Sequence, residues 1–190
     1  MLATVLSYVL CLYGLVHQAF LLCLVPEQLP ANTVDHQQFL GKWYFKAAVG
    51  QREADIERFK VMDNMWINME EPVNDTLLVT GQMRIGDDCI KQTWTYHILP
   101  ERHDVVLEGM PRQRTLLWSG KWANCPECII IQEVKQPLKE TDSEDSLNRY
   151  FLYTRQSDVN HEVVKVFLNN LACHNASASV RLPQEKEFCT

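Results

Sequence analysis

The opening segment of the chain has no charged side chains. Residues 1–26 contain no Lys, Arg, Asp or Glu, so every formally charged residue lies from Glu27 onward. The chain also lacks a long run of basic residues, and its formal net charge is −6 with a pI near 5.5. Binding to nucleic acid needs clustered Lys and Arg that neutralise phosphates. The composition therefore argues against a nucleic-acid partner.

Internal repeats, low-complexity tracts and familiar catalytic motifs are also missing. The sequence contains no G-x-S-x-G or H-E-x-x-H pattern, and its six His are scattered. Without a recognisable set of nucleophile, base and orienting residue, we do not expect an enzyme. Hydrophobic residues make up 46% and charged residues 22% of the 190 residues. This balance is typical of a globular chain that can bury a core.

The uncharged segment 1–25 resembles a secretory signal. It has no basic residue beyond the amino terminus, and it has no clear small-x-small cleavage site: Ala19 is preceded at −3 by His17, and apolar residues continue to Val25. Two interpretations remain open, a cleaved signal or a retained apolar anchor, because about 25 apolar residues can span a bilayer. In both cases we expect one folded domain over residues 26–190.

Cysteine usage points to an oxidising compartment. Cys11 lies inside the signal, and the other six cysteines form an even set, as in disulfide-bonded secreted domains. Six cysteines allow about 15 pairings, so the sequence alone fixes none of them. Two glycosylation sequons, at Asn74 and Asn175, agree with export. We therefore expect a secreted, extracellular protein.

Short apolar runs separated by turn-rich pieces fill the region 41–155. Alternation is clear in "CIKQTWTYHIL", where Trp94, Tyr96 and Ile98 share one face and His97 lies on the other. The eight runs are 42–49, 64–70, 76–85, 89–99, 104–109, 115–120, 128–134 and 149–155. Without intervening helices, this spacing indicates an antiparallel sandwich or barrel. We favour a barrel, because closure removes exposed edges and eight strands leave room for one small ligand.

After the last run the periodicity changes to that of a helix. The segment 157–175 places apolar side chains on one side, and Ser157 or Asp158 could cap its first turn. These apolar residues are Val163, Val164, Phe167, Leu168 and Leu171. The polar tail 176–190 needs an anchor, which Cys189 could supply by pairing back to the body.

Two distant motifs carry a family resemblance. Gly41-x-Trp43 begins the first run, and Arg155 ends the last run just before the helix. Together they resemble the lipocalin pattern, although the middle motif of that family is not visible here. The resemblance implies an all-β fold: an eight-stranded antiparallel up-and-down β-barrel with one C-terminal α-helix packed on the barrel. It also implies that Trp43 closes one end of the barrel and that Arg155 packs across its ring.

Within the lipocalins, the segments "LGKWYF", "DNMWINM", "RYFLYTR" and "RLPQEKEFC" are most similar to the apolipoprotein M branch. The orosomucoid branch (alpha-1-acid glycoprotein) is the next most similar. The resemblance implies two disulfides, Cys23–Cys173 and Cys89–Cys189. The branch has a third disulfide, and its second cysteine, just before the helix, is absent from this sequence. Cys125 is therefore expected to pair locally with Cys128 across "CPEC". A thioredoxin-like or zinc role for "CPEC" is the weaker alternative, since neither the βαβ context nor a second ligand pair is present.

The resemblance also implies a small lipophile inside the barrel, such as sphingosine-1-phosphate, a retinoid or a fatty acid. Carried over by position, the expected ligand-binding residues are Trp94, Tyr96, Glu133, Arg149, Tyr153, Gln92 and Met110. Gln92 and Met110 replace two arginines of the branch, so we expect weak phosphate selectivity. Arg112 or Arg114 could substitute for them. Trp94 and Tyr96 could instead be plain core aromatics.

The remaining expectations concern partners. We expect a monomer without cofactor or metal, and association of the N-terminal apolar segment with the surface of a plasma lipoprotein is a hypothesis. The alternative is an orosomucoid-like binding or immunomodulatory lipocalin that is not bound to lipoprotein. A lipocalin-type enzyme, such as a prostaglandin isomerase, would need a reactive Cys inside the barrel. Cys89 is the candidate, but Cys189 is its expected partner.

Overall fold

The computed structural model describes residues 7–10, 26–139, 143–158 and 160–190. The predicted signal or anchor, together with Cys11 and Cys23, therefore falls outside the described residues except for a helical turn at residues 7–10. Among the helices of the described residues, none combines the length and apolar character that crossing a membrane requires.

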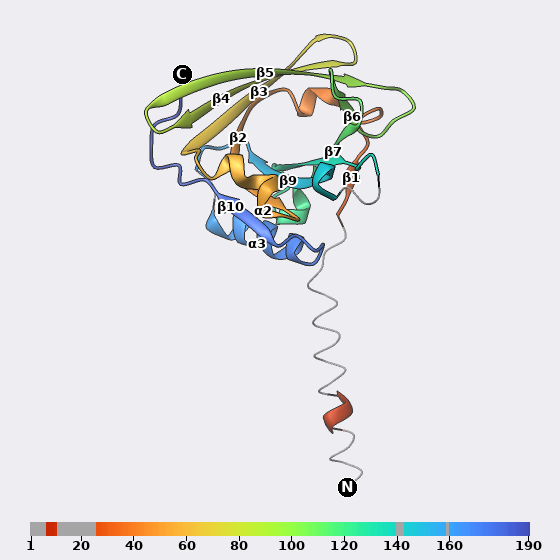
Figure 1. The fold of residues 1–190 in the computed structure, drawn as a ribbon, viewed down its shortest axis with the longest axis vertical. Coiled ribbons are helices and arrows are strands. Elements are labelled where there is room, and N and C mark those ends of the chain that lie inside the picture. The colour runs from red at the N-terminus through yellow and green to blue at the C-terminus, as the bar shows by residue number, and fades with distance from the viewer. Residues whose placement is uncertain (1–6, 11–25, 140–142, 159) are drawn as a thin grey trace.

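Eight antiparallel strands, β2 to β9, form a closed ring (Figure 1). Each strand pairs with its neighbours in sequence, and β9 pairs with β2 to close the barrel. The strands are β2 (Gly41–Gly50), β3 (Asn64–Val73), β4 (Thr76–Ile85), β5 (Asp88–Ile98), β6 (Val105–Leu107), β7 (Gln113–Ser119), β8 (Ile129–Lys135) and β9 (Leu147–Thr154). All eight predicted runs are strands, so the predicted barrel architecture is confirmed.

Alternation along the strands separates two apolar clusters. On β3, Met65, Ile67 and Met69 are buried inside the barrel, where they join the main core. On β8, Ile129 points inward, whereas Ile130 packs in a second cluster on the outside of the wall. Strands β8 and β9 are apolar on both faces because both faces are covered. This explains why their sequences read as continuous apolar runs.

The helix α3 (His161–Ala172) covers the outside of the wall next to β2 and β9 (Figure 1). Val164, Phe167 and Leu171 are buried there. The predicted caps Ser157 and Asp158 are wrong: Asn160 is the N-cap, and its side chain accepts a hydrogen bond from the Glu162 amide at 2.9 Å. The earlier residues belong to the turn after β9.

A plug closes the end of the barrel where β2 begins. The Trp43 ring is buried, and its Nε1 donates to the Phe39 carbonyl at 2.8 Å, just after the 3-10 helix η1 (His36–Gln38). The Arg155 guanidinium lies 3.6 Å from the centre of that ring. Gly41 has φ +89, a left-handed conformation that favours glycine, and a side chain there would meet Arg155 at 3.6 Å. Gly41, Trp43 and Arg155 therefore close this end of the barrel.

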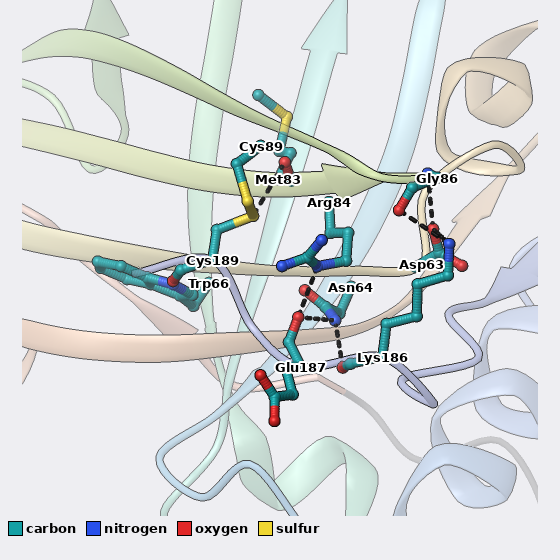
Figure 2. The surroundings of a disulfide bond; sticks show 10 residues. All are labelled: Asp63, Asn64, Trp66, Met83, Arg84, Gly86, Cys89, Lys186, Glu187 and Cys189. Carbon is teal, nitrogen blue, oxygen red and sulfur yellow. Dashed lines mark hydrogen bonds and ion pairs between the residues drawn. A yellow bond between two sulfur atoms is a disulfide. The ribbon is translucent and has the colours of Figure 1, made fainter.

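The C-terminal tail is tied to the barrel along its length. Strand β10 (Ala178–Arg181) pairs with β2, a contact that the sequence patterns did not predict. Farther along, the carbonyls of Lys186, Glu187 and Cys189 accept hydrogen bonds from side chains of β3 and β4 (Figure 2). The Cys89–Cys189 disulfide, with an S–S distance of 2.09 Å, fixes its end to β5. The predicted anchor of the tail is thus present. The two-residue strand β1 (Gln28–Leu29) pairs with β7.

Candidate functional site

The barrel encloses a cavity at its centre. The cavity volume, counted as the space open to the centres of water molecules, is about 140 Å³. This is roughly ten times the space that holds one buried water. Most of its wall is apolar, contributed by strands β3 to β9. Seven lining side chains have polar groups: Arg58, Gln92, Trp94, Tyr96, Thr115, Glu133 and Tyr153. A site of this composition can hold an apolar body and orient one polar end.

Glu133 and Arg149 form a buried ion pair on adjacent strands. The Arg149 Nε and Nη2 atoms donate to Glu133 Oε2 at 2.7 and 2.5 Å. A third donor, Nη1, bonds to the carbonyl of Asp55 at 3.0 Å. Asp55 belongs to the short helix α2 (Glu53–Ile56), which follows β2 at the end of the barrel opposite the plug. Arg149 therefore neutralises Glu133 and also holds the segment that crosses the mouth.

Arg58 lies in that mouth segment, in the 3-10 helix η2 (Glu57–Phe59). It lines the cavity at its mouth, and the residue is exposed to solvent there. Burial lowers the pKa of the Arg58 guanidinium, and the neighbouring charge of Arg149 lowers it further. Its neighbour Phe59 packs edge-on against Phe45 and Phe151, at 5.4 and 5.2 Å between ring centres. These contacts fix the backbone next to Arg58.

Three hydroxyl groups complete the polar part of the wall. Burial raises the pKa values of Tyr96 and Tyr153, and the charge of Glu133 raises them further, so both remain protonated donors. Thr115 is only 2% exposed, and its Oγ1 has no hydrogen-bond partner among the described residues. An unpartnered buried hydroxyl is costly in an empty site. A polar group of a ligand could satisfy it.

Five of the seven predicted ligand-binding residues line the cavity, and contact with a ligand remains a prediction for them: Gln92, Trp94, Tyr96, Glu133 and Tyr153. Arg149 does not line it, because its guanidinium is turned toward Glu133 and Asp55. Met110 does not line it either. It lies 53% exposed in the turn between β6 and β7, just after Gly109 with φ 77.

The arginines considered as substitutes do not reach the cavity. Arg112 pairs with Asp145 at 2.7 Å, and Arg114 bonds to Asp104 at 3.1 Å. The cation that lines the cavity, Arg58, comes from the irregular segment 51–63, which sequence reasoning left unassigned. The apolar Phe59 next to it, within a charged stretch, was the available signal that this segment returns to the core.

Trp94 stacks over Gly81 on the neighbouring strand. A Cβ atom at Gly81 would lie 2.7 Å from Trp94 Cζ3 and 2.9 Å from Cη2. The glycine therefore leaves room for the indole at the cavity wall. Any side chain at this position would push the ring into the space available to a ligand.

The cysteines of the described residues are oxidised. Cys125 and Cys128 form the local disulfide, as expected. Cys173 is disulfide-bonded as well, and its expected partner Cys23 lies outside the described residues. The Cys89 thiol that the enzyme alternative requires is bonded to Cys189.

The tryptophans outside the cavity serve packing and do not form one exposed cluster. Trp122 is buried in the outer cluster against Trp118, with ring centres 5.9 Å apart. Trp66 lies elsewhere and donates to the Cys189 carbonyl at 2.7 Å.

One cluster of the described residues has ligand atoms close enough for a metal: His36, Glu71 and Asp75, within 4.8 Å of one another. His36 Nδ1 lies 3.2 Å from Glu71 Oε1, and Nε2 lies 2.8 Å from the Ala31 carbonyl. Both ring nitrogens are thus engaged by hydrogen bonds. The cluster links the plug to the hairpin between β3 and β4.

Solved structures with this architecture are lipocalins. The siderocalin Ex-FABP superposes with a TM-score of 0.62 at 15% identity, covering 80% of this chain and 97% of that one. Lipocalin 12 from rat epididymis superposes with a TM-score of 0.61 at 14% identity, covering 80% and 84%. At these identities the likeness shows the fold alone.

Sequence relatives give the family. Apolipoprotein M of Rattus norvegicus is 28% identical over 187 residues, covering 94% of this chain and 92% of that protein. Apolipoprotein M of Mus musculus is 28% identical over 189 residues, covering 95% and 93%. The ApoM domain model matches residues 1–190. The chain is a lipocalin that belongs to the apolipoprotein M family.

Proposed function

We propose that this protein is a secreted carrier that holds one small lipophile in the barrel. The observation that supports this most is the cavity itself: an apolar space inside a closed barrel, sealed at one end by Trp43 and Arg155 and lined by polar groups toward the other. One chain supplies the whole lining, so a monomer would suffice. Retinoids and fatty acids fit this description better than phosphorylated lipids, because Gln92 on the cavity wall supplies no cation.

Burial of the apolar tail would provide most of the affinity. A ligand that loses about 300 Å² of apolar surface gains about 7 kcal/mol at 25 cal/mol per Å². Part of this is offset by the cost of association. The remainder supports reversible binding, which suits a carrier.

Titration with dodecanol tests the carrier function, because this probe has an apolar chain and an uncharged head. Trp94 lines the cavity, so we expect a saturable change in tryptophan emission with one lipid per chain. Gly81→Val should weaken binding, since its side chain would displace Trp94 into the cavity. Binding that is unsaturable, or equal in this variant, would contradict the proposal.

Export and lipoprotein association belong to the same proposal. Asn74 and Asn175, the two sequon asparagines, are both exposed and so available for glycosylation. The N-terminal apolar segment would insert into a lipoprotein surface if it is retained. N-terminal sequencing of secreted protein tests this: an intact Met1 supports the anchor, and a start after Ala19 or near Cys23 would rule it out.

A further inference from the structure

We propose that the barrel prefers a lipophile with a singly charged carboxylate head group, and that Arg58 is the residue that sets this preference. The inference rests on the proposed carrier function, since it specifies which class of lipophile the same cavity takes. Three features of the cavity support it: its charge, the fixed position of Arg58 and the unpartnered hydroxyl of Thr115.

The charges around the polar part of the cavity do not cancel. The carboxylate of Glu133 accepts two hydrogen bonds from Arg149 and is neutralised by it. Arg58 has no ion-pair partner among the described residues, and its guanidinium lies 4.8 Å from the centre of the Phe59 ring. The set of Arg58, Arg149 and Glu133 thus has one positive charge in excess. The Arg58 side chain is exposed at the mouth, so it can form charge-assisted hydrogen bonds to an anionic head group that enters there.

The position of Arg58 is built into the fold. Phe59 locks the η2 helix to the core through Phe45 and Phe151, and Arg149 holds the preceding helix α2 through the Asp55 carbonyl. The backbone at Arg58 is therefore fixed at the mouth before any ligand arrives, and the side chain lies along the cavity lining. A planar guanidinium suits two parallel hydrogen bonds to a carboxylate.

Further donors surround the place where the head group would lie. Thr115 faces Glu133 across the β7–β8 pair, and its buried hydroxyl is unpartnered. Tyr96 and Tyr153 line the same cavity and interact electrostatically with both Arg58 and Glu133. A carboxylate has two oxygens with about four acceptor positions. It can accept from Arg58 and from hydroxyl groups at the same time.

A phosphate monoester matches this set of charges less well. It carries about −1.5 to −2 charges at neutral pH, and a single excess cation leaves part of that charge unmatched close to Glu133. Gln92, an additional donor on the wall of β5, is neutral. A neutral alcohol, by contrast, gains nothing from Arg58 beyond an ordinary hydrogen bond.

Three probes with the same chain test the preference: dodecanoic acid, dodecanol and dodecyl phosphate. Dissociation constants would be measured by tryptophan fluorescence for the full chain and for Arg58→Gln, Arg58→Lys and Lys60→Gln. We expect the acid to bind about tenfold or more tighter than the alcohol, because hydrogen bonds to a charged group are the stronger ones. Arg58→Gln should weaken binding of the acid far more than binding of the alcohol, which loses at most one ordinary hydrogen bond, so that the difference between the two probes disappears, and Arg58→Lys should restore part of it.

Lys60→Gln is the matched control. Lys60 lies two residues away at the same mouth, but it pairs with Glu53 and Glu57 and does not line the cavity. Its removal should leave the preference intact, which excludes a general effect of net charge. Equal binding of acid and alcohol, an unchanged preference in Arg58→Gln, or tighter binding of dodecyl phosphate would each overturn the inference. Failure of all three probes to bind would instead overturn the carrier function.

Discussion

Single residues in this barrel connect its wall to its mouth. Arg149 illustrates this, because its guanidinium bonds to Glu133 on β8 and to the Asp55 carbonyl of α2. The place of Arg149 in the sequence suggested that it contacts a ligand. Its hydrogen bonds show instead that it holds Glu133 and α2 in place. The same arrangement leaves Arg58 as the cation that faces the cavity.

Glu133→Leu should destabilise the fold by about 3–5 kcal/mol, because Arg149 would remain buried without its carboxylate. The double variant Glu133→Leu/Arg149→Met should recover most of this loss, since an apolar pair can replace a buried ion pair. Urea unfolding with an unchanged slope would measure both values. A double variant no more stable than the single one would contradict the conclusion that Glu133 neutralises the buried charge of Arg149.

Asp104 gives a pH-dependent prediction. Burial acts to raise the pKa of its carboxyl, but hydrogen bonds from Arg102 and Arg114 outweigh burial and lower it. Because the folded chain then releases this proton more readily than the unfolded chain, the carboxylate stabilises the fold above about pH 4. That contribution is lost as the pH falls through the folded pKa.

Asp104→Asn should therefore cost about 2 kcal/mol at pH 7, and the difference from the native chain should shrink toward pH 2.5. Urea midpoints at both pH values would measure it. A difference that is constant with pH, or that grows in acid, would show that the pair with Arg102 and Arg114 does not stabilise the fold in this way.

At the scale of elements, the start of α3 is set by Asn160. Asn160→Ala should cost about 1 kcal/mol, because the Glu162 amide loses its acceptor. Ser157→Ala is the control, since among the described residues only the backbone carbonyl of Ser157 accepts a hydrogen bond, from Lys46. Thermal or urea unfolding compares the two. Equal losses in both variants would mean that the cap does not determine the helix start.

The tail is the second element with a clear energetic role. Its disulfide closes a segment with a sequence separation of 100, and Cys125–Cys128 closes one of 3. By loop entropy, the double variant Cys89→Ser/Cys189→Ser should lose about 4–5 kcal/mol, and Cys125→Ser/Cys128→Ser about 2. Guanidinium unfolding gives both values. The first variant should also shift Trp66 emission to the red, since Trp66 bonds to the Cys189 carbonyl. Equal losses of unfolding free energy in the two double variants would contradict a larger stabilisation by the disulfide of the tail.

Much of the whole molecule could be predicted from the pattern of side chains. Strands such as β4 and β5 have clear alternation or turn residues at both ends, and β8 and β9 are continuous apolar runs because α3 covers their outer face. The short strands β1 and β10 have two and four residues, too few to show a period, and their partners β7 and β2 determine them.

The site was less predictable because part of it depends on contacts between residues that are distant in the sequence. Trp94 and Tyr96 follow from alternation along β5, and both line the cavity. Arg58 lies in a segment without period, and its direction depends on Phe59 and on the bond from Arg149 to Asp55. These are contacts with strands that lie far away in the sequence. Only the assembled barrel shows that this arginine faces inward.

The measurement that tests the central claim most directly is native mass spectrometry of the full chain titrated with dodecanoic acid. The proposed carrier should saturate with one lipid per chain, and Gly81→Val should need more lipid to reach the same occupancy. Release and identification of any lipid that copurifies should give one small lipophile per barrel. Loading with several lipids at once, or identical loading of Gly81→Val, would contradict a ligand site inside the barrel.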